Sequence, residues 1–78
     1  MVTVYTRKGC HLCEHAEAIV AVARQKISFE LEIVDIDLSP ALKEKYGMDV
    51  PVIAVDGRDR FGYAIELDAF LHVLEHRH

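Results

Sequence analysis

The succession of apolar patterns along this 78-residue chain predicts an α/β fold in which helices flank a four-stranded mixed sheet. Residues 2–5 and 29–36 have the composition of strands, and the segment between them has helical apolar spacing. Two strands joined by a full helix should lie parallel, with a right-handed crossover. Asp56 and Gly57 are a strong hairpin signal that joins two further short strands in antiparallel order. The predicted order of elements is therefore βαβ, helix, β-hairpin and helix.

Local patterns define the first three elements. Residues 1–5 alternate in polarity and are rich in β-branched side chains, which favours a strand. A polar loop over residues 6–9 follows, and a helix is predicted from residue 11 to about residue 25. Residues 29–36 alternate apolar side chains with glutamates, which predicts the second strand. The apolar positions at helical spacing are Leu12, Ala16, Ile19, Val20 and Ala23.

Capping and turn residues define the second half of the chain. Ser39 can cap a short helix whose first residue is Pro40, because proline at that position loses no needed N–H. Gly47 is expected to end this helix in a left-handed conformation. Residues 50–55 predict the third strand and residues 58–61 the fourth. A closing helix, beginning near Glu66, is predicted from the apolar positions Leu67, Phe70, Leu71 and Leu74.

Length and composition limit the classes of protein to which the chain can belong. It is expected to form one domain, over residues 1–78, near the lower size limit for a hydrophobic core. The net charge of −4 argues against a nucleic-acid partner, because phosphate binding needs a basic surface. Two cysteines are too few for the disulfide framework of a small secreted protein. With no leader-like segment and no apolar run near about 18 residues, we expect a cytoplasmic monomer with no membrane contact.

The most informative motif is the cysteine pair Cys10 and Cys13, at the junction between the first strand and the first helix. Cysteines three residues apart can close a local disulfide and reopen it. The N-terminal end of a helix also favours the thiolate form of the first cysteine, which is the form that attacks disulfides. A CxxC motif near a βαβ pattern in a cytosolic protein is typical of a thioredoxin-like redox site.

Two alternatives to a redox site are open at this level. The cysteines could be inert packing residues, or they could supply half of a zinc site. Zinc would need two further ligands, and no second CxxC motif or compact histidine pair stands at finger-like spacing. His72 and His76 lie four residues apart on one predicted helical face, but most histidines are expected to be solvated surface residues. The histidines of the chain are His11, His15, His72, His76 and His78.

Three segments of the sequence carry a resemblance to a known family. They are VYTRKGCHLC at residues 4–13, DVPV at residues 49–52 and the pair Phe61 and Gly62. Over nearly its whole length the chain resembles the glutaredoxin-like branch of the thioredoxin superfamily, and it is similar to small bacterial glutaredoxin-like proteins. The resemblance implies a thioredoxin-like fold and redox chemistry at the CxxC motif.

The resemblance also implies roles for individual residues. Cys10 would be the exposed cysteine that attacks a substrate disulfide, and Cys13 the more buried cysteine that resolves the mixed disulfide. Pro51 would follow a cis peptide bond and lie against the cysteines. The backbone of Val50 would pair with an incoming peptide or glutathione like a short added strand. Lys8 matches by type the lysine that meets the glycyl carboxylate of glutathione.

The region around Gly62 departs from the glutathione-binding pattern of the family. Glutaredoxins that hold glutathione usually have a Gly-Gly pair followed by an aspartate, whereas here Tyr63 follows Gly62 and Glu66 takes the place of the aspartate. Redox chemistry therefore carries over to this chain more firmly than glutathione binding does. Tyr63 would stand close to the cysteines, where it could restrict access or offer a contact surface. The other aromatic residues singled out are expected to be packing residues: Tyr5, Phe29, Tyr46, Phe61 and Phe70.

The basic side chains beside the cysteines have two interpretations each. A protonated His11 would stabilise the thiolate of Cys10, whereas a His11 side chain directed to solvent would have no role. Arg7 and Lys8 could contact an anionic ligand. The favoured interpretation is that both are solvated and only raise the local positive potential.

The sequence thus favours a thiol–disulfide oxidoreductase that reduces protein disulfides or glutathione mixed disulfides through Cys10 and Cys13. We expect no metal or organic cofactor, and glutathione is a candidate co-substrate. The electrons would come from glutathione or from a donor of the thioredoxin-reductase type. The alternative hypothesis is a non-catalytic metal-binding or redox-sensing adaptor module that uses the same fold.

Overall fold

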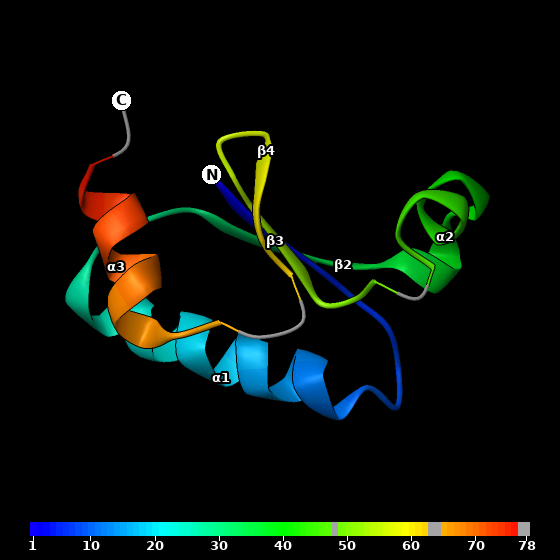
Figure 1. Ribbon diagram of the computed structural model, residues 1–78, viewed down its shortest axis with the longest axis horizontal. Coiled ribbons are helices and arrows are strands. Elements are labelled where there is room, and N and C mark those ends of the chain that lie inside the picture. Colours follow the sequence, from blue (N-terminus) through cyan, green and yellow to red (C-terminus); the bar gives the residue numbers. More distant parts are fainter. Residues whose placement is uncertain (48, 63–64, 77–78) are drawn as a thin grey trace.

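A computed structural model describes residues 1–47, 49–62 and 65–76 of the chain (Figure 1). Its elements are, in order, β1 (Val2–Thr6), α1 (His11–Lys26), β2 (Leu31–Asp35), the 3-10 turn η1 (Ile36–Leu38), α2 (Pro40–Tyr46), β3 (Val52–Val55), β4 (Arg58–Gly62) and α3 (Leu67–Glu75). Within these described ranges, no helix is long and apolar enough to cross a membrane.

The four strands form one mixed sheet in the order β2-β1-β3-β4. β1 pairs in parallel with β2, with Tyr5 opposite Val34, and antiparallel with β3, with Tyr5 opposite Val52. β4 pairs antiparallel with β3 through a tight turn. Both turn residues have positive φ, 51° for Asp56 and 86° for Gly57, as the predicted hairpin requires. The predicted α/β class and mixed sheet are confirmed.

The main core lies between the sheet and the helices α1 and α3, which lie together in Figure 1. Alternate residues of a strand face opposite sides of a sheet, so Val4 and Ile53 point into this core while their neighbours do not. The Phe70 ring of α3 is fully buried and meets Phe29 and Phe61 edge to face, with centroids 5.9 Å apart in each pair. These three aromatic residues are core packing, as predicted.

A second, smaller core cluster joins the start of α1 to the end of α2 and to β3. Its buried members are Cys13, Ile36, Tyr46, Val50 and Val52. The Tyr5 ring packs against it and stacks on Tyr46, with the ring centroids 4.5 Å apart. The CxxC motif therefore lies where three elements meet.

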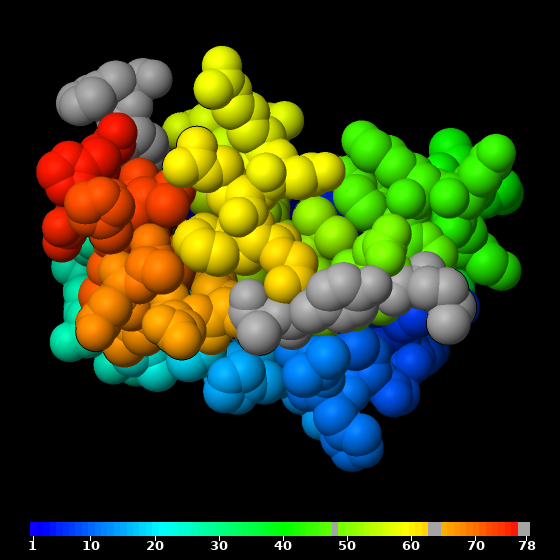
Figure 2. All heavy atoms as spheres, in the orientation of Figure 1, coloured from blue at the N-terminus to red at the C-terminus, as the bar shows by residue number. Residues whose placement is uncertain are grey.

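In Figure 2, β4 (yellow) lies between α3 (orange to red) and α2 (green) on the visible face.

Several local details differ from the sequence predictions. The second strand begins at Leu31 rather than at residue 29. It also ends early, at Asp35, because the Asp35 carboxylate accepts the Asp37 N–H over 2.9 Å and begins η1, a turn that was not predicted. The third strand begins at Val52 rather than at residue 50. Gly47 has φ −3°, so its expected left-handed conformation is wrong. A glycine is needed there for another reason, since a Cβ would lie 2.9 Å from the carbonyl oxygen of Lys43.

Candidate redox site

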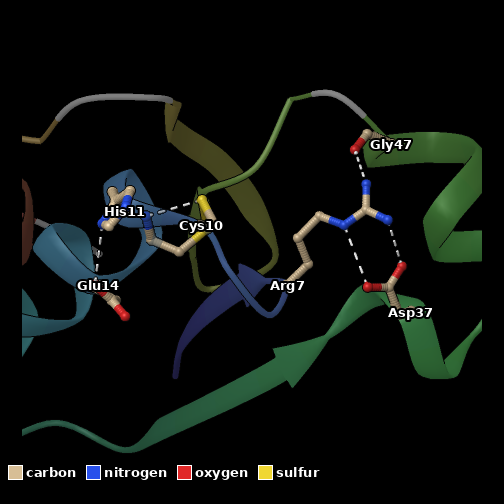
Figure 3. Close-up of a disulfide and its surroundings, with 7 residues drawn as sticks. Arg7, Cys10, His11, Glu14, Asp37 and Gly47 are labelled. Carbon is tan, nitrogen blue, oxygen red and sulfur yellow. Dashed lines mark hydrogen bonds and ion pairs between the residues drawn. A yellow bond between two sulfur atoms is a disulfide. The ribbon is translucent and has the colours of Figure 1, made fainter.

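Cys10 and Cys13 form a disulfide at the start of α1, with their Cα atoms 5.2 Å apart (Figure 3). Cys10 is the N-cap residue of the helix, and its Sγ accepts a hydrogen bond from the backbone N–H of Cys13 over 3.1 Å. The sulfur thus satisfies one of the free N–H groups of the first turn. In the reduced protein, the same N–H and the positive end of the helix dipole would stabilise a thiolate on Cys10.

The two cysteines differ in accessibility. Cys13 is 1% exposed and belongs to the same buried cluster as Ile36 and Val50. Cys10 is only partly buried. Of the two cysteines, Cys10 is therefore the one that is more open to solvent. A site with an exposed attacking cysteine and a buried resolving cysteine requires this difference in exposure.

A cavity of about 330 Å³ opens beside the disulfide, and both cysteines line it. Lys8 also lines it, is exposed, and forms no ion pair with the residues that the structure describes. Three carboxylates face the same space, those of Glu14, Glu17 and Asp35. The surroundings of the cysteines are therefore mixed in charge rather than uniformly basic.

Arg7 is not the solvated side chain that the sequence predicts, because its guanidinium is hydrogen-bonded within the protein. Its Nη2 and Nε donate to the two carboxylate oxygens of Asp37, over 2.8 Å and 3.3 Å. Its Nη1 donates to the carbonyl oxygen of Gly47 over 3.0 Å. Figure 3 shows the side chain extended away from Cys10, toward these two partners. The Arg7 guanidinium is thus engaged within the protein, and Lys8 is the cation of this cavity that a ligand can use.

His11 lies on the surface beside the disulfide. Its side chain is 98% exposed, and its Nδ1 is 3.6 Å from the Glu14 carboxylate (Figure 3). The structure favours the interpretation in which His11 points to solvent. The ion-pair partner of His11 among the described residues is this carboxylate on the same helix.

The segment expected to dock substrates lies next to the cysteines. The Val50–Pro51 peptide bond is cis, both residues are buried, and Val50 shares the second core cluster with Cys13. Gly62 is close to this segment, because a Cβ added to it would lie 4.0 Å from the Pro51 carbonyl oxygen. The structure therefore places Val50 in one cluster with the cysteine pair, and Pro51 and Gly62 lie next to each other directly beyond it. Tyr63, the other candidate for substrate contact, lies outside the described residues.

Comparison with known proteins assigns the family. A model of the glutaredoxin-like domain (DUF836) matches residues 1–75. The chain belongs to this family. Among solved structures, protein XcR50 of X. campestris is 32% identical, with a TM-score of 0.80 and 96% of each chain covered. Protein Ne2328 of Nitrosomonas europaea is 35% identical, with a TM-score of 0.74 over 88% of this chain and 84% of the other.

Two further comparisons place this glutaredoxin-like protein in a wider context. A mutant thioredoxin from Halobacterium salinarum has a TM-score of 0.69 at 23% identity, over 95% of this chain and 70% of the other. This similarity confirms the thioredoxin-like fold. An uncharacterized protein of Mycobacterium bovis, Mb0520, is 26% identical over an alignment of 70 residues, and the match covers 83% of this chain and 72% of the relative.

The described histidines of the glutaredoxin-like protein form no metal site with its cysteines. Within the described ranges, no three potential ligands lie together in a geometry that could hold a metal ion. His72 and His76 of α3 contact each other, with ring centroids 4.4 Å apart. His15 is exposed on α1, and His78 lies outside the described residues. The zinc half-site interpretation of the cysteines gains no support from the described part of the chain.

The sequence analysis missed a polar link on the α2 side of the site. The Tyr46 hydroxyl donates to the carboxylate of Asp59 in β4, with oxygen distances of 3.1 Å and 3.2 Å. Burial raises the pKa of Tyr46, and the hydrogen bond to Asp59 adds to the rise while Lys45 opposes it. The hydrogen bond with Tyr46 also raises the pKa of Lys45. The one signal in the sequence for a polar contact here was the position of Tyr46 next to Gly47, which was expected to end the helix. No residue near Tyr46 in the sequence indicated that Asp59 would be its partner.

Proposed function

We propose that this glutaredoxin-like protein is a thiol–disulfide oxidoreductase that reduces protein disulfides or glutathione mixed disulfides. Cys10 is the nucleophile and Cys13 the resolving thiol. The observation that carries the proposal is the difference in exposure between two cysteines that lie within bonding distance. Only the partly exposed sulfur can meet a substrate, and its buried neighbour is placed to displace that substrate afterwards.

The reaction is a pair of thiol–disulfide exchanges. The Cys10 thiolate attacks one sulfur of the substrate disulfide, which forms a mixed disulfide and releases the other sulfur as a thiolate that takes up a proton. The Cys13 thiol then loses its proton and attacks the Cys10 sulfur, which closes the internal disulfide and releases the second substrate thiol. The substrate gains two electrons and two protons, and the protein is left oxidised.

Substrate docking is proposed at the Val50–Pro51 segment. An extended peptide would pair with the backbone of Val50 while its disulfide meets Cys10, in the manner of a short added strand. Glutathione is the smaller candidate, and its carboxylates would have Lys8 as a cationic contact in the cavity beside the disulfide. Three carboxylates line the same cavity, so we propose protein disulfides as the preferred substrates.

The oxidised protein needs a reductant to turn over. We propose glutathione or a donor of the thioredoxin-reductase type, acting in a reducing compartment such as the cytoplasm. The reduction potential of the Cys10–Cys13 pair distinguishes the two sources. A reduction potential of about −270 mV fits a thioredoxin-like system, and one of about −200 to −230 mV fits a glutaredoxin-like system.

Turnover of a disulfide-linked peptide with dithiothreitol as the reductant tests the proposal. Wild-type protein should accelerate the reaction, and Cys10→Ser should abolish the acceleration. Cys13→Ser should instead accumulate a mixed disulfide between Cys10 and the peptide, which intact-mass spectrometry detects. Full turnover by Cys10→Ser would refute the proposed nucleophile. Stoichiometric zinc in the purified protein, without turnover, would favour the metal-binding module instead.

A further inference from the structure

We infer that Arg7 is a positioning residue, which ties the loop that carries Cys10 to the segment that docks substrates. The inference rests on the proposed function, because it assigns Arg7 a part in presenting a substrate to that nucleophile. Arg7 is three residues before Cys10 and follows the last residue of β1. Its partner Gly47 is three residues before Val50. One side chain therefore links the two halves of the site across a sequence separation of 40 residues.

The helix that leads into the docking segment is otherwise anchored through one side chain. α2 is seven residues long, and Tyr46 is its one buried residue, stacked on Tyr5 and hydrogen-bonded to Asp59. Leu42 is partly buried against the same cluster, and the remainder of the helix is exposed. The Gly47 N–H caps the helix by donating to the Lys43 carbonyl over 2.8 Å. The Gly47 carbonyl is then held by Arg7, at the point where the chain leaves α2 for Val50.

The tie depends on the shape of the guanidinium. Two of its nitrogens bind the two oxygens of Asp37 side by side, which leaves Nη1 directed at the Gly47 carbonyl (Figure 3). Asp37 is itself held in place, because its backbone N–H donates to the Asp35 carboxylate. A lysine ammonium is a point charge that cannot reproduce this planar fork. Arginine is therefore required for the link, and a positive charge alone is not enough.

The orientation of Arg7 separates positioning from electrostatic activation of the cysteine. The guanidinium extends away from Cys10, and its charge is paired with Asp37 (Figure 3). Its effect on catalysis should therefore arise from the placement of the Val50 segment relative to the sulfur. A peptide must contact both places at once, and misplacement by about 1 Å can cost up to about a hundredfold in rate. A small disulfide needs to contact only the Cys10 sulfur, so its reduction should not depend on where the Val50 segment lies.

The test compares two substrates on one set of variants. The substrates are a disulfide-linked peptide of about eight residues, which can lie along the docking segment, and 2-hydroxyethyl disulfide, which cannot. The variants are Arg7→Lys, Arg7→Met and Asp37→Asn, with Lys43→Met as the control that removes an exposed cation from α2. The readout is the ratio of kcat/KM for the peptide to kcat/KM for the small disulfide. A second readout is the amide hydrogen exchange of Gly47 and Asp49.

We expect the ratio to fall about tenfold in all three variants, mainly through KM for the peptide, and to stay at the wild-type value in Lys43→Met. The amides of Gly47 and Asp49 should exchange faster in the same three variants. A ratio retained by Arg7→Lys but lost by Arg7→Met would overturn the inference, because charge would then be sufficient. Parallel loss for both substrates would overturn it too, because the docking segment would not be the part affected.

The two proposals fail in different ways. Wild-type protein that reduces neither substrate would refute the proposed function, and the exchange rates would still show whether Arg7 holds this segment. If Arg7→Met does not fold, Asp37→Asn and Arg7→Lys decide the question, because each keeps a side chain of similar size. Unchanged exchange at Gly47 and Asp49 in both would refute the tie itself.

Discussion

The Tyr46 hydroxyl donates a hydrogen bond to the carboxylate of Asp59, and this contact joins α2 to the edge strand β4. The Tyr46 ring is buried and stacked on Tyr5, so its hydroxyl is held in one place. Burial is also the main reason that the pKa of Tyr46 is raised. A group whose pKa is higher in the folded protein than in the unfolded chain links stability to pH.

Alkaline pH should destabilise the protein through this tyrosine. The folded state keeps the Tyr46 proton to a higher pH than the unfolded chain, so the stabilisation is complete below about pH 10 and declines as the pH rises above it. The raised pKa of Lys45 acts in the same direction. Urea unfolding at about pH 9, 10 and 11 measures the effect. Tyr46→Phe should unfold about 1 kcal/mol more easily at neutral pH, yet lose less stability on going to alkaline pH. An equally steep alkaline loss in Tyr46→Phe would contradict this assignment.

Two glycines near the site should respond differently to alanine. Gly47→Ala would place a Cβ 2.9 Å from the Lys43 carbonyl oxygen, so the backbone must shift, and we expect a loss of about 1–3 kcal/mol in the free energy of unfolding. Gly62→Ala is the matched control, because its Cβ would lie at an ordinary 4.0 Å from the Pro51 carbonyl oxygen. Its stability should change by less than about 0.5 kcal/mol. Equal losses in the two variants would argue against the steric explanation.

Phe70 should be the most sensitive position in the main core. It is 0% exposed and meets two other aromatic rings edge to face, so Phe70→Ala should cost about 3–5 kcal/mol in unfolding free energy. Leu38, at 84% exposed, serves as the control, and Leu38→Ala should change stability by less than about 0.5 kcal/mol. Thermal or urea unfolding followed by circular dichroism measures both. A Phe70→Ala protein close to wild type would show that the core is packed differently.

His11 should have no influence on the redox pair. Its side chain is 98% exposed, and its ion-pair partner among the described residues is the Glu14 carboxylate. His11→Ala should therefore leave the reduction potential of the Cys10–Cys13 pair unchanged, as should the control His15→Ala on the same helix. The potentials are measured by equilibration with glutathione redox buffers. A shift of about 30 mV or more, which corresponds to about 1.4 kcal/mol, would restore a functional role for His11.

Features that depend on local sequence were predictable. The Asp56–Gly57 turn follows from a requirement for positive φ at both residues, and the alternation of residues in β1 and β3 follows from one buried face. The helix start at the CxxC motif was also predictable, because it follows directly on a strand and a polar loop. The apolar patterns and the hairpin signal carried the prediction of a mixed α/β sheet, and the resemblance to glutaredoxin-like proteins added the thioredoxin-like fold.

Features that depend on distant pairing were not predictable. Arg7 contacts Asp37 and Gly47, which are 30 and 40 residues away in the sequence, and no residue near Arg7 signals either partner. The need for glycine at position 47 was predicted for the wrong reason, since a close contact with a carbonyl oxygen decides it and φ does not. The direction of the His11 side chain likewise could not be derived from its position beside Cys10, because surface rotamers are weakly constrained.

The burial of Cys13 also limits how many molecules can be attached to the protein at once. If the Cys13 sulfur stays in the second core cluster on reduction, the proposed exchange would attach a substrate at Cys10 alone. One substrate would then have to leave Cys10 before the next could be bound covalently. The oxidised and reduced forms would then alternate in strict succession, one client at a time.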